Sequence, residues 1–456
     1  MKRISKKIKL KNTSRFKLLL LNWAQQFEHI VWLDSNEYPQ KHSNFDVVLA
    51  VNAATFLETN FDNAFLELQH YREKTNDFVF GYLSYDLKND VENLTSNNKD
   101  GLEFSDLYFF QPKKLFFIKD DVLEIQYLSE YENEIDSDLE NIRHYKACPE
   151  LISGTDEVIF QNKISNQQIT SQSSTTRNDV KIHKRITKKE YLKRLDTILE
   201  HIHRGDIYEV NFCQEFYAEN TTIEPLKVYQ HLNKISSPPF ASFLKLNDKY
   251  LLSASPERFV KRENDTIISQ PIKGTAKRLA NKKLDSKLAK QLEQDTKERS
   301  ENIMIVDLVR NDLSKTAIKG SVKVEELCKV YSFKQVHQLI STVISNVNSS
   351  TDSVDIIKSM FPMGSMTGAP KISAMQIIEQ QETIKRSLYS GAVGYFTPNG
   401  DFDFNVVIRS ILYNQSKQYL SYSVGGAITA KSIPEKEYQE CLLKAIAMKR
   451  ALKLSD

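Results

Sequence analysis

The sequence predicts an α+β fold built on large antiparallel β-sheets sandwiched by helices. Short runs rich in β-branched and aromatic residues, such as FDVVLAV at 45–51, indicate strands. Longer amphipathic stretches with capping residues at their ends indicate helices. Strands and helices do not alternate in the regular order of a doubly wound parallel sheet, and no repeat of about 20–50 residues occurs. Mainly antiparallel sheets therefore fit the pattern best.

The order of these segments predicts two regions and a polar connection. In the first region, DFVFGYLSYDL at 77–87 and LEIQYL at 123–128 indicate further strands. Residues 151–186 are rich in Ser, Thr, Asn and Gln, which is typical of a linker or loop. We therefore expect an N-terminal region over 1–150 and a second domain over 187–456.

The second domain begins with a helix signature. Thr187 and Glu190 have the spacing of a capping box, and Gly205 closes the amphipathic stretch that follows. The runs ASFLKL, YLLSAS and AVGYFT then predict strands among further helices.

Composition argues against several functions. The 456 residues include 62 Lys and Arg against 59 Asp and Glu, and the formal net charge is +3. This near balance does not support a nucleic-acid or membrane partner. The apolar run from Leu18 to Leu21 is too short to span a bilayer. We expect a soluble, cytoplasmic protein.

The four cysteines, Cys148, Cys213, Cys328 and Cys441, are far apart and lack metal-ligand spacing. Reduced thiols are the expected state. None of them lies in a GxCxG turn, so the sequence shows no glutaminase nucleophile of its own.

Two helices carry candidate metal ligands. In QDTKERSENIMIVDLVRND, Glu301 shares a helical face with Ile305 and Leu308, and a carboxylate on an apolar face needs a partner such as a cation. Near the C-terminus, a helix that starts at Ser432 and Pro434 places Glu437 and Glu440 on one face. Carboxylates without a nearby His suit Mg²⁺. The alternatives are an ion pair of Glu301 with Lys297 or Arg299 and a solvated acidic helix face.

Glycine-bearing turns and an arginine suggest anion binding. The turn at 364–368, followed by Pro370 at the predicted first position of a helix, can expose backbone amides. Gly425 and Gly426 in VGGAIT predict a second tight turn that a ligand could approach closely. Arg409, in the predicted strand FNVVIRSILY, suits a carboxylate, although a structural salt bridge explains it equally well.

Three further residues are candidates for acid, base or nucleophile. Glu257 follows Pro256 at the end of a predicted strand. Lys273 lies in PIKGT, and a desolvated lysine can act as a nucleophile, although most lysines are solvated surface groups. His337 in VHQLIST is by default a hydrogen-bonded core histidine.

Together these motifs resemble the chorismate-binding enzyme family. SPERF, PIKGTAKR, ERSENIMIVDLVRND, GSMTGAPK, GYFTPNGDFDFNVVIRS and GGAITAKSIPEKEYQE follow the family's order across about 186–452. The N-terminal part more loosely resembles that of anthranilate and aminodeoxychorismate synthases. The resemblance implies the anthranilate-synthase-like fold for the catalytic domain. Lysine in the PIKGT pentapeptide is typical of aminodeoxychorismate synthases, whereas anthranilate synthases usually carry alanine there.

The resemblance also implies roles for individual residues. It implies that Glu301 and Glu440 ligate Mg²⁺, with Glu437 close to the metal. For the substrate, it implies contacts from Arg409, Tyr395, His337, Ser365 and the backbone around Gly425 and Gly426.

Amination of chorismate at C4 is the activity implied. Glu257 would be the general acid, and Lys273 would attack C2 and drive out the C4 hydroxyl before ammonia attacks C4. A separate glutamine amidotransferase subunit would supply the ammonia. Glu209 departs from the family, because the synthases carry glutamine there and isochorismate-forming relatives carry lysine. Anthranilate synthase, isochorismate or salicylate synthase, and a catalytically silent binding protein are the alternatives.

Overall fold

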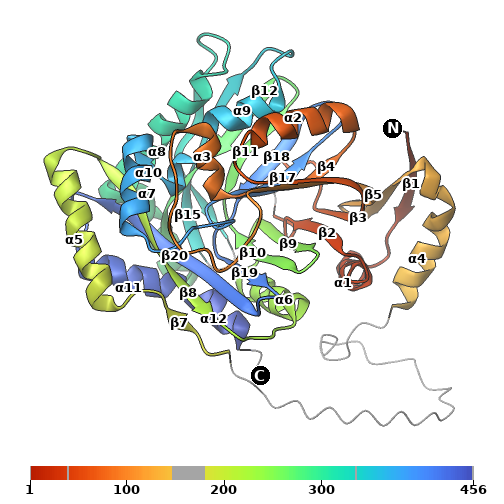
Figure 1. Ribbon diagram of the computed structural model, residues 1–456, viewed down its shortest axis with the longest axis horizontal. Helices are drawn as coiled ribbons and strands as arrows, with labels where there is room; N and C mark the ends of the chain where they lie inside the picture. The colour runs from red at the N-terminus through yellow and green to blue at the C-terminus, as the bar shows by residue number, and fades with distance from the viewer. Residues whose placement is uncertain (1, 39–40, 146–179, 334–335, 454–456) are drawn as a thin grey trace.

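The computed structural model describes residues 2–38, 41–145, 180–333 and 336–453. Its strands join in one continuous sheet with helices around it (Figure 1). Neighbouring strands run antiparallel, for example β2 (His29–Asp34) with β3 (Val47–Thr59). The predicted α+β class with a large antiparallel sheet is therefore confirmed.

The N-terminal region combines long strands with short helices. Its remaining elements are β1 (Arg3–Lys9), α1 (Thr13–Ala24), α2 (Ala64–Thr75), β4 (Val79–Leu83), α3 (Lys88–Val91), β5 (Leu107–Lys119), β6 (Val122–Leu128) and α4 (Ile135–His144).

The part of the chain from residue 180 onward contains the remaining strands and helices. Its first half has β7 (His183–Lys184), α5 (Lys188–Arg204), β8 (Glu209–Ala218), α6 (Pro225–Ser236), β9 (Phe240–Leu246), β10 (Lys249–Ser255), β11 (Arg258–Glu263), β12 (Thr266–Gln270), β13 (Ile272–Lys277), α7 (Lys282–Gln294) and α8 (Thr296–Ser314). Its second half has β14 (Lys323–Ser332), β15 (Val336–Asn346), α9 (Ser353–Met360), β16 (Gly368–Ala369), α10 (Lys371–Gln381), β17 (Ala392–Phe396), β18 (Phe402–Val406), β19 (Ser410–Asn414), β20 (Tyr419–Thr429), α11 (Pro434–Lys444) and α12 (Ile446–Leu452).

The predicted capping box of α5 is present. The Thr187 hydroxyl accepts the Glu190 N–H, while the Glu190 carboxylate accepts the Thr187 N–H, so both donors at the helix start are paired. Gly205 ends the helix with a φ of +89°, a conformation that glycine adopts without strain.

The two predicted regions share the sheet. Strand β2 pairs with β9, and β4 pairs with β17, so strands from both regions are hydrogen-bonded neighbours. The two predicted regions are therefore separate in the sequence but contribute strands to the same sheet. Most of the predicted linker, residues 151–179, lies outside the described residues, as does Cys148; Cys213, Cys328 and Cys441 are unpaired and buried.

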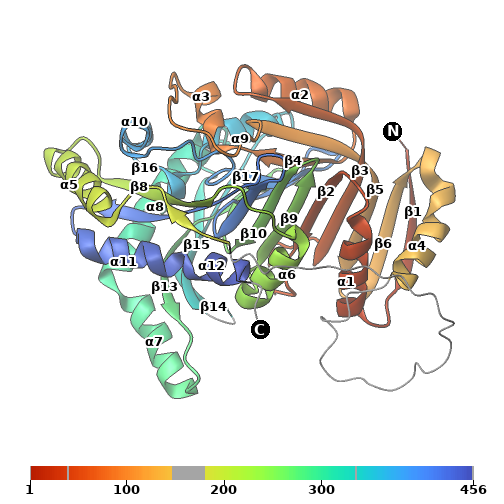
Figure 2. The same cartoon turned by 60° about the horizontal axis from the view of Figure 1, so that its bottom comes forward.

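Two large hydrophobic clusters cover the two faces of the sheet. Ile30 and Trp32 of β2 pack into the first cluster, and Val31 packs into the second, as alternation along a strand requires. Figure 2 shows α6, α11 and α12 on one side of the sheet and α2, α3 and α9 on the other. No helix among the described residues is long and apolar enough to cross a membrane.

Three local predictions are wrong. Arg409 is not inside a strand, because β18 ends at Val406 and Arg409 has a φ of +52° before β19 begins. Gly425 and Gly426 lie within β20 rather than in a turn. Pro370 is the N-cap residue of α10 and not its first helical residue.

Candidate active site

Lys273 lies beside a buried carboxylate. Its Nζ donates to Glu209 Oε1 at 2.9 Å, and the two side chains are 12% and 1% exposed. Burial alone lowers the pKa of Lys273, but the charges of Glu209, Glu301 and Glu257 outweigh it and raise the pKa above its usual value. Near neutral pH Lys273 is therefore an ammonium ion, which becomes a nucleophile only after it loses a proton.

The glycine of PIKGT shapes the backbone at this lysine. Gly274 has a φ of +88°, and the register of β13 against β15 shifts between Ile272 and Thr275. Glycine is suited to such a bulge because it adopts positive φ freely. A Cβ at Gly274 would also lie 3.1 Å from Glu298 Oε2, so the strand approaches α8 closely just after Lys273.

Glu257 is buried and hydrogen-bonded to the turn at 364–368. The Ser365 hydroxyl donates to Glu257 Oε1 at 2.7 Å. Burial raises the pKa of Glu257 to about 7, although the Ser365 bond and the charges of Lys273 and Arg409 act in the opposite direction. A carboxyl group with this pKa is partly protonated near neutrality, which is the behaviour a general acid needs.

Four carboxylates from two helices act electrostatically on one lysine. Glu298 and Glu301 of α8 and Glu437 and Glu440 of α11 all interact electrostatically with Lys297. Glu298 was not a candidate from the sequence, although it lies one helical turn before Glu301. Its i, i+3 spacing was the signal that could have identified it.

The pKa values of these carboxylates reflect first their burial and then the charges around them. Burial raises the pKa of Glu301 to about 7, with Lys273 and Lys297 opposing this rise and Glu298 adding to it. Burial and the charge of Glu440 also raise the pKa of Glu437. For Glu440, burial is outweighed by Lys444, which lies 2.9 Å away, so its pKa is lowered.

The carboxylates fit a hard cation bound partly through water. Oxygen donors without histidine suit Mg²⁺, and a cation would stabilise the ionised form of Glu301, whose pKa is raised mainly by burial and further by the charge of Glu298. Within the described residues, no three His, Cys, Asp or Glu side chains converge closely enough to hold a metal on their own. Both alternatives that the sequence left open are partly met. Lys297 lies 3.7 Å from Glu301, as the ion-pair alternative predicts, and the Glu440 side chain is 50% exposed, as a solvated helix face would be.

Arg409 presents an unpaired guanidinium. Its side chain makes no hydrogen bond or ion pair with any residue that the structure describes, so the structural salt bridge weighed from the sequence is not seen there. Burial lowers its pKa, with Glu257 as the opposing charge, which places the two groups near each other. A guanidinium in this setting is suited to binding a carboxylate.

The two glycines of β20 have different surroundings. A Cβ at Gly425 would lie 2.1 Å from Phe212 O on β8, so glycine is needed for the close approach of these strands. A Cβ at Gly426 would be 3.7 Å from Glu437 Oε2 and 3.9 Å from Glu440 Oε1. The nearest atom would be Lys444 Nζ at 3.5 Å, so a Cβ at Gly426 would fit beside these side chains in ordinary van der Waals contact.

Tyr395 lies apart from these groups. It lines a separate cavity of about 50 Å³ together with Asp34, Phe45 and Arg258. None of the glutamates described above belongs to the described lining of that cavity. The substrate contact expected of Tyr395 therefore disagrees with its position.

A different tyrosine approaches the glycine strand. The Tyr389 hydroxyl lies 3.4 Å from Cys213 Sγ, and Cys213 pairs directly with Gly425 in the sheet. Both tyrosines belong to the segment LYSGAVGYF, so the motif alone could not separate them.

His337 is hydrogen-bonded on both ring nitrogens and only 2% exposed. Nε2 lies 3.0 Å from Asp285 Oδ1 of α7, and Nδ1 lies 2.7 Å from Ser332 Oγ of β14. These contacts support the default interpretation, a structural histidine, over the expected substrate contact.

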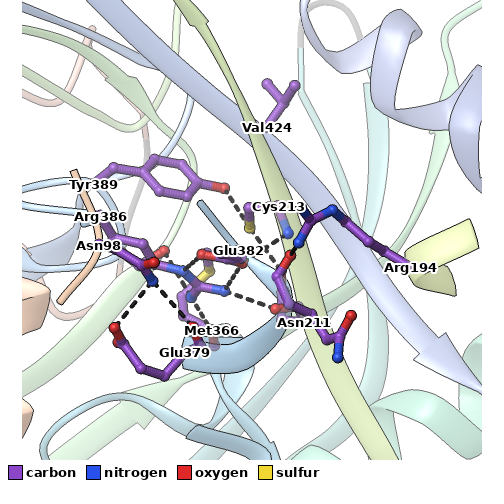
Figure 3. A network of polar contacts seen from close by, with 12 residues as sticks. Asn98, Arg194, Asn211, Cys213, Met366, Glu379, Glu382, Arg386, Tyr389 and Val424 are labelled. Atoms are coloured by element: carbon purple, nitrogen blue, oxygen red, sulfur yellow. Dashed lines mark hydrogen bonds and ion pairs between the residues drawn. The ribbon is translucent and has the colours of Figure 1, made fainter. Parts of the chain in front are cut away.

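A buried polar network holds the site segments together (Figure 3). Arg386 donates to both carboxylate oxygens of Glu382, at 2.9 and 2.7 Å. The same guanidinium donates to Met366 O and to Asn211 O, each at 2.7 Å. Glu382 Oε1 also accepts the Cys213 N–H at 2.9 Å. One ion pair thus joins the turn at 364–368 to strand β8.

The network fixes two site residues relative to each other. Met366 follows Ser365, and the Asn211 side chain donates to Ser365 O at 3.0 Å. Glu209 lies on the same strand as Asn211, and its backbone packs closely against Gly368. A Cβ at Gly368 would lie 2.1 Å from Glu209 O. Ser365, which bonds to Glu257, and Glu209, which pairs with Lys273, are therefore both positioned by the packing of the turn at 364–368 against β8.

The fold and the site define a class of protein: an α+β enzyme fold with clustered carboxylates, a largely buried ammonium and a guanidinium that has no partner among the described residues. These groups suit a small acidic substrate. The crystal structure of anthranilate synthase component I from Streptococcus pneumoniae matches the fold with a TM-score of 0.75, at 24% identity, over 91% of this chain and 94% of that one.

Sequence comparisons give the family. The family model described as chorismate binding enzyme matches residues 24–450. Aminodeoxychorismate synthase component 1 of Salmonella typhimurium is 40% identical over 60% of this chain and 60% of its own length. That of Bacillus subtilis is 31% identical over 83% of this chain and 77% of its own length. This chain belongs to the chorismate-binding enzyme family, as the motifs predicted, and its match spans less than two thirds of the Salmonella relative.

Proposed function

We propose that the protein aminates chorismate at C4 to give 4-amino-4-deoxychorismate, with ammonia as the nitrogen donor. The contact between Lys273 and buried Glu209, beside the partly protonated Glu257, carries this proposal. It supplies a candidate nucleophile and a candidate acid in one site. The names of the Salmonella and Bacillus relatives support the same reaction.

Substrate binding rests on complementary charge. Arg409, with no partner among the described residues, would bind the enolpyruvyl carboxylate, with backbone amides around Gly425 and Gly426 close by. Tyr389 replaces Tyr395 as the tyrosine that we place near this carboxylate, because it approaches Gly425 through Cys213.

The metal is part of the proposal. Glu301 and Glu440 would hold Mg²⁺, with Glu437 beside it, and the bound ion would offset the negative charge of the ring carboxylate. Ser365 would contact the substrate while it holds Glu257 in place.

The reaction divides between two residues. Glu257, protonated, gives its proton to the C4 hydroxyl, which leaves as water. Lys273, as the free amine, forms the bond to C2 that drives this departure. Ammonia then attacks C4 and expels the lysine. A separate glutamine amidotransferase subunit would provide ammonia in the cell, and the product would serve 4-aminobenzoate and folate synthesis.

Product analysis tests the proposal. Purified protein is incubated with chorismate, Mg²⁺ and an ammonium salt at mildly alkaline pH, and the products are separated and weighed by mass spectrometry. Aminodeoxychorismate, converted to 4-aminobenzoate by an added lyase, is the expected product. Anthranilate would assign the chain to the rival amination, isochorismate would assign it to water addition, and unreacted chorismate would support a binding role only.

A further inference from the structure

Glu209 has one oxygen engaged and one free. Oε1 accepts the Lys273 hydrogen bond, whereas Oε2 is buried and has no hydrogen-bond partner among the described residues. A buried carboxylate oxygen without a partner is unusual because it has lost its hydrogen bonds to water and no protein hydrogen bond replaces them. A group that accepts a proton or a ligand during the reaction would explain such an oxygen.

The proposed nucleophile creates a need for an acceptor. Lys273 rests as an ammonium, and an ammonium has no lone pair with which to attack carbon. Its proton must therefore move before the bond to C2 forms. The largely enclosed site makes a group in direct contact the most accessible acceptor.

Only a few acidic groups near Lys273 could accept its proton. The neighbours that act electrostatically on it come from three elements and one loop: Glu209 on β8, Glu298 and Glu301 on α8, Glu440 on α11, and Glu257 in the loop before β11. Glu257 is needed as the acid, and Glu301 and Glu440 are committed to the metal. Of the two that remain, Glu209 makes the hydrogen bond to Lys273.

We propose that Glu209 is the proton acceptor that converts the Lys273 ammonium into the attacking amine. This inference rests on the proposed amination. It gives a function to the residue at which the chain departs from the glutamine of the synthases that it resembles.

The proton transfers balance over one turnover. Glu209 takes one proton from Lys273, and the amine forms the C2–N bond as the C4–O bond breaks and Glu257 releases its proton to the leaving water. In the second half, ammonia forms the C4–N bond, the C2–N bond breaks, and its electron pair returns to Lys273. Glu209 gives its proton back to this amine, and Glu257 takes one from the new C4 ammonium. Both carboxyl groups are then reset.

The backbone holds Glu209 in place for this transfer. Glu209 is paired with Thr429 of β20 on one side and with Ala369 of β16 on the other. Its side chain starts from a strand fixed on both edges, so the 2.9 Å contact with Lys273 does not depend on a mobile loop.

Glu209→Gln tests the acceptor role because it keeps the shape and removes the basic oxygen. The full chain is mixed with chorismate and Mg²⁺ without ammonia, and the lysine adduct is followed by rapid quenching and intact-protein mass spectrometry across pH. We expect the adduct to form about tenfold or more slowly than in the wild type near neutrality. The ratio of the two rates at each pH should approach one as pH rises and solvent takes the proton, because deprotonation of Glu257 slows both proteins alike. Glu209→Asp should restore part of the rate, and chorismate binding should be unchanged.

The controls separate the possible failures. Glu219→Gln, an exposed glutamate just after β8, should form adduct at the wild-type rate. Adduct formation in Glu209→Gln at the wild-type rate or faster throughout the pH range would overturn the acceptor role and leave the amination intact. Absence of any adduct in the wild type would overturn the covalent step, and with it the role of Glu209, whatever product is released.

Discussion

The hydroxyl of Ser365 lies 2.7 Å from Glu257 Oε1 and donates a hydrogen bond to it. This bond stabilises the ionised form of Glu257, so it opposes the burial that raises the pKa to about 7. The buried turn at 364–368 therefore has an effect in addition to its proposed contact with the substrate. It moderates the protonation of the proposed general acid.

Ser365→Ala should move the basic limb of the pH profile. A general acid works only when protonated, so kcat/KM of the wild type should fall as pH rises through about 7. Loss of the Ser365 bond raises the pKa of Glu257, and the limb should therefore shift to higher pH. The rates must be compared at a constant concentration of free ammonia. Ammonium also loses its proton as pH rises, so the concentration of the attacking ammonia would otherwise change across the profile.

Ser314→Ala is the matched control for this profile. Ser314 is an exposed serine at the end of α8 that bonds only to Asn311 O in the described structure. Its profile should superimpose on that of the wild type. A limb for Ser365→Ala that stays in place or moves to lower pH would contradict the proposed coupling between the turn and Glu257.

Lys273→Ala should abolish the covalent adduct. The change removes the proposed nucleophile but leaves Arg409 and the carboxylates proposed to bind the metal, so chorismate and Mg²⁺ should still bind while turnover falls by about 10²-fold or more. Intact mass spectrometry measures the adduct, and calorimetry measures binding. Lys277→Ala, an exposed lysine on the same strand, provides the control. Unchanged turnover in Lys273→Ala would remove this residue from the mechanism.

Sequence reasoning was most successful where local rules decide. The capping box at Thr187 and Glu190 depends on four consecutive residues, and the structure has both of its hydrogen bonds. The helices that carry Glu301 and Glu440 also follow from local periodicity. The family followed from six motifs in order, which is information that a single residue cannot provide.

The failures concern side-chain direction and distant contacts. Tyr389 and Tyr395 lie in one short segment, but the chain bends on both sides of Tyr389. Ser387 and Ser390 both adopt positive φ before β17 begins. Strand alternation therefore cannot be extended back to Tyr389. The hydrogen-bond partners of His337, Asp285 and Ser332, also come from other elements that the sequence does not bring together. The Glu209 contact with Lys273 likewise spans 64 positions.

Glu440→Gln should weaken Mg²⁺ binding. The change removes one anionic ligand from the acidic group on α8 and α11, and we expect the affinity to fall about tenfold or more, equivalent to ~1.4 kcal/mol. Calorimetric titration of Mg²⁺ measures this without turnover. Glu435→Gln, on the same helix but paired with Lys188 at the surface, should leave the titration unchanged. An ordinary titration for Glu440→Gln would count against the metal assignment.

Arg386→Met should destabilise the fold more than any surface ion pair does. The side chains of Arg386 and Glu382 are 1% and 3% exposed, and the loss of the guanidinium leaves a buried carboxylate without its main partner. Breaking one side of such a pair costs about 3–5 kcal/mol. Equilibrium unfolding in urea measures the loss. Arg310→Met, which breaks a surface pair with Asp307, should cost less than about 1 kcal/mol.

The double variant Arg386→Met with Glu382→Leu separates charge from packing. If the cost of the single variant comes from an unpaired buried carboxylate, removal of that carboxylate should recover part of the free energy of unfolding. The carbonyls of Met366 and Asn211 and the Cys213 N–H would still lack their partners, so recovery should be incomplete. A double variant as unstable as the sum of both single changes would instead assign the stabilisation to packing and to these backbone bonds.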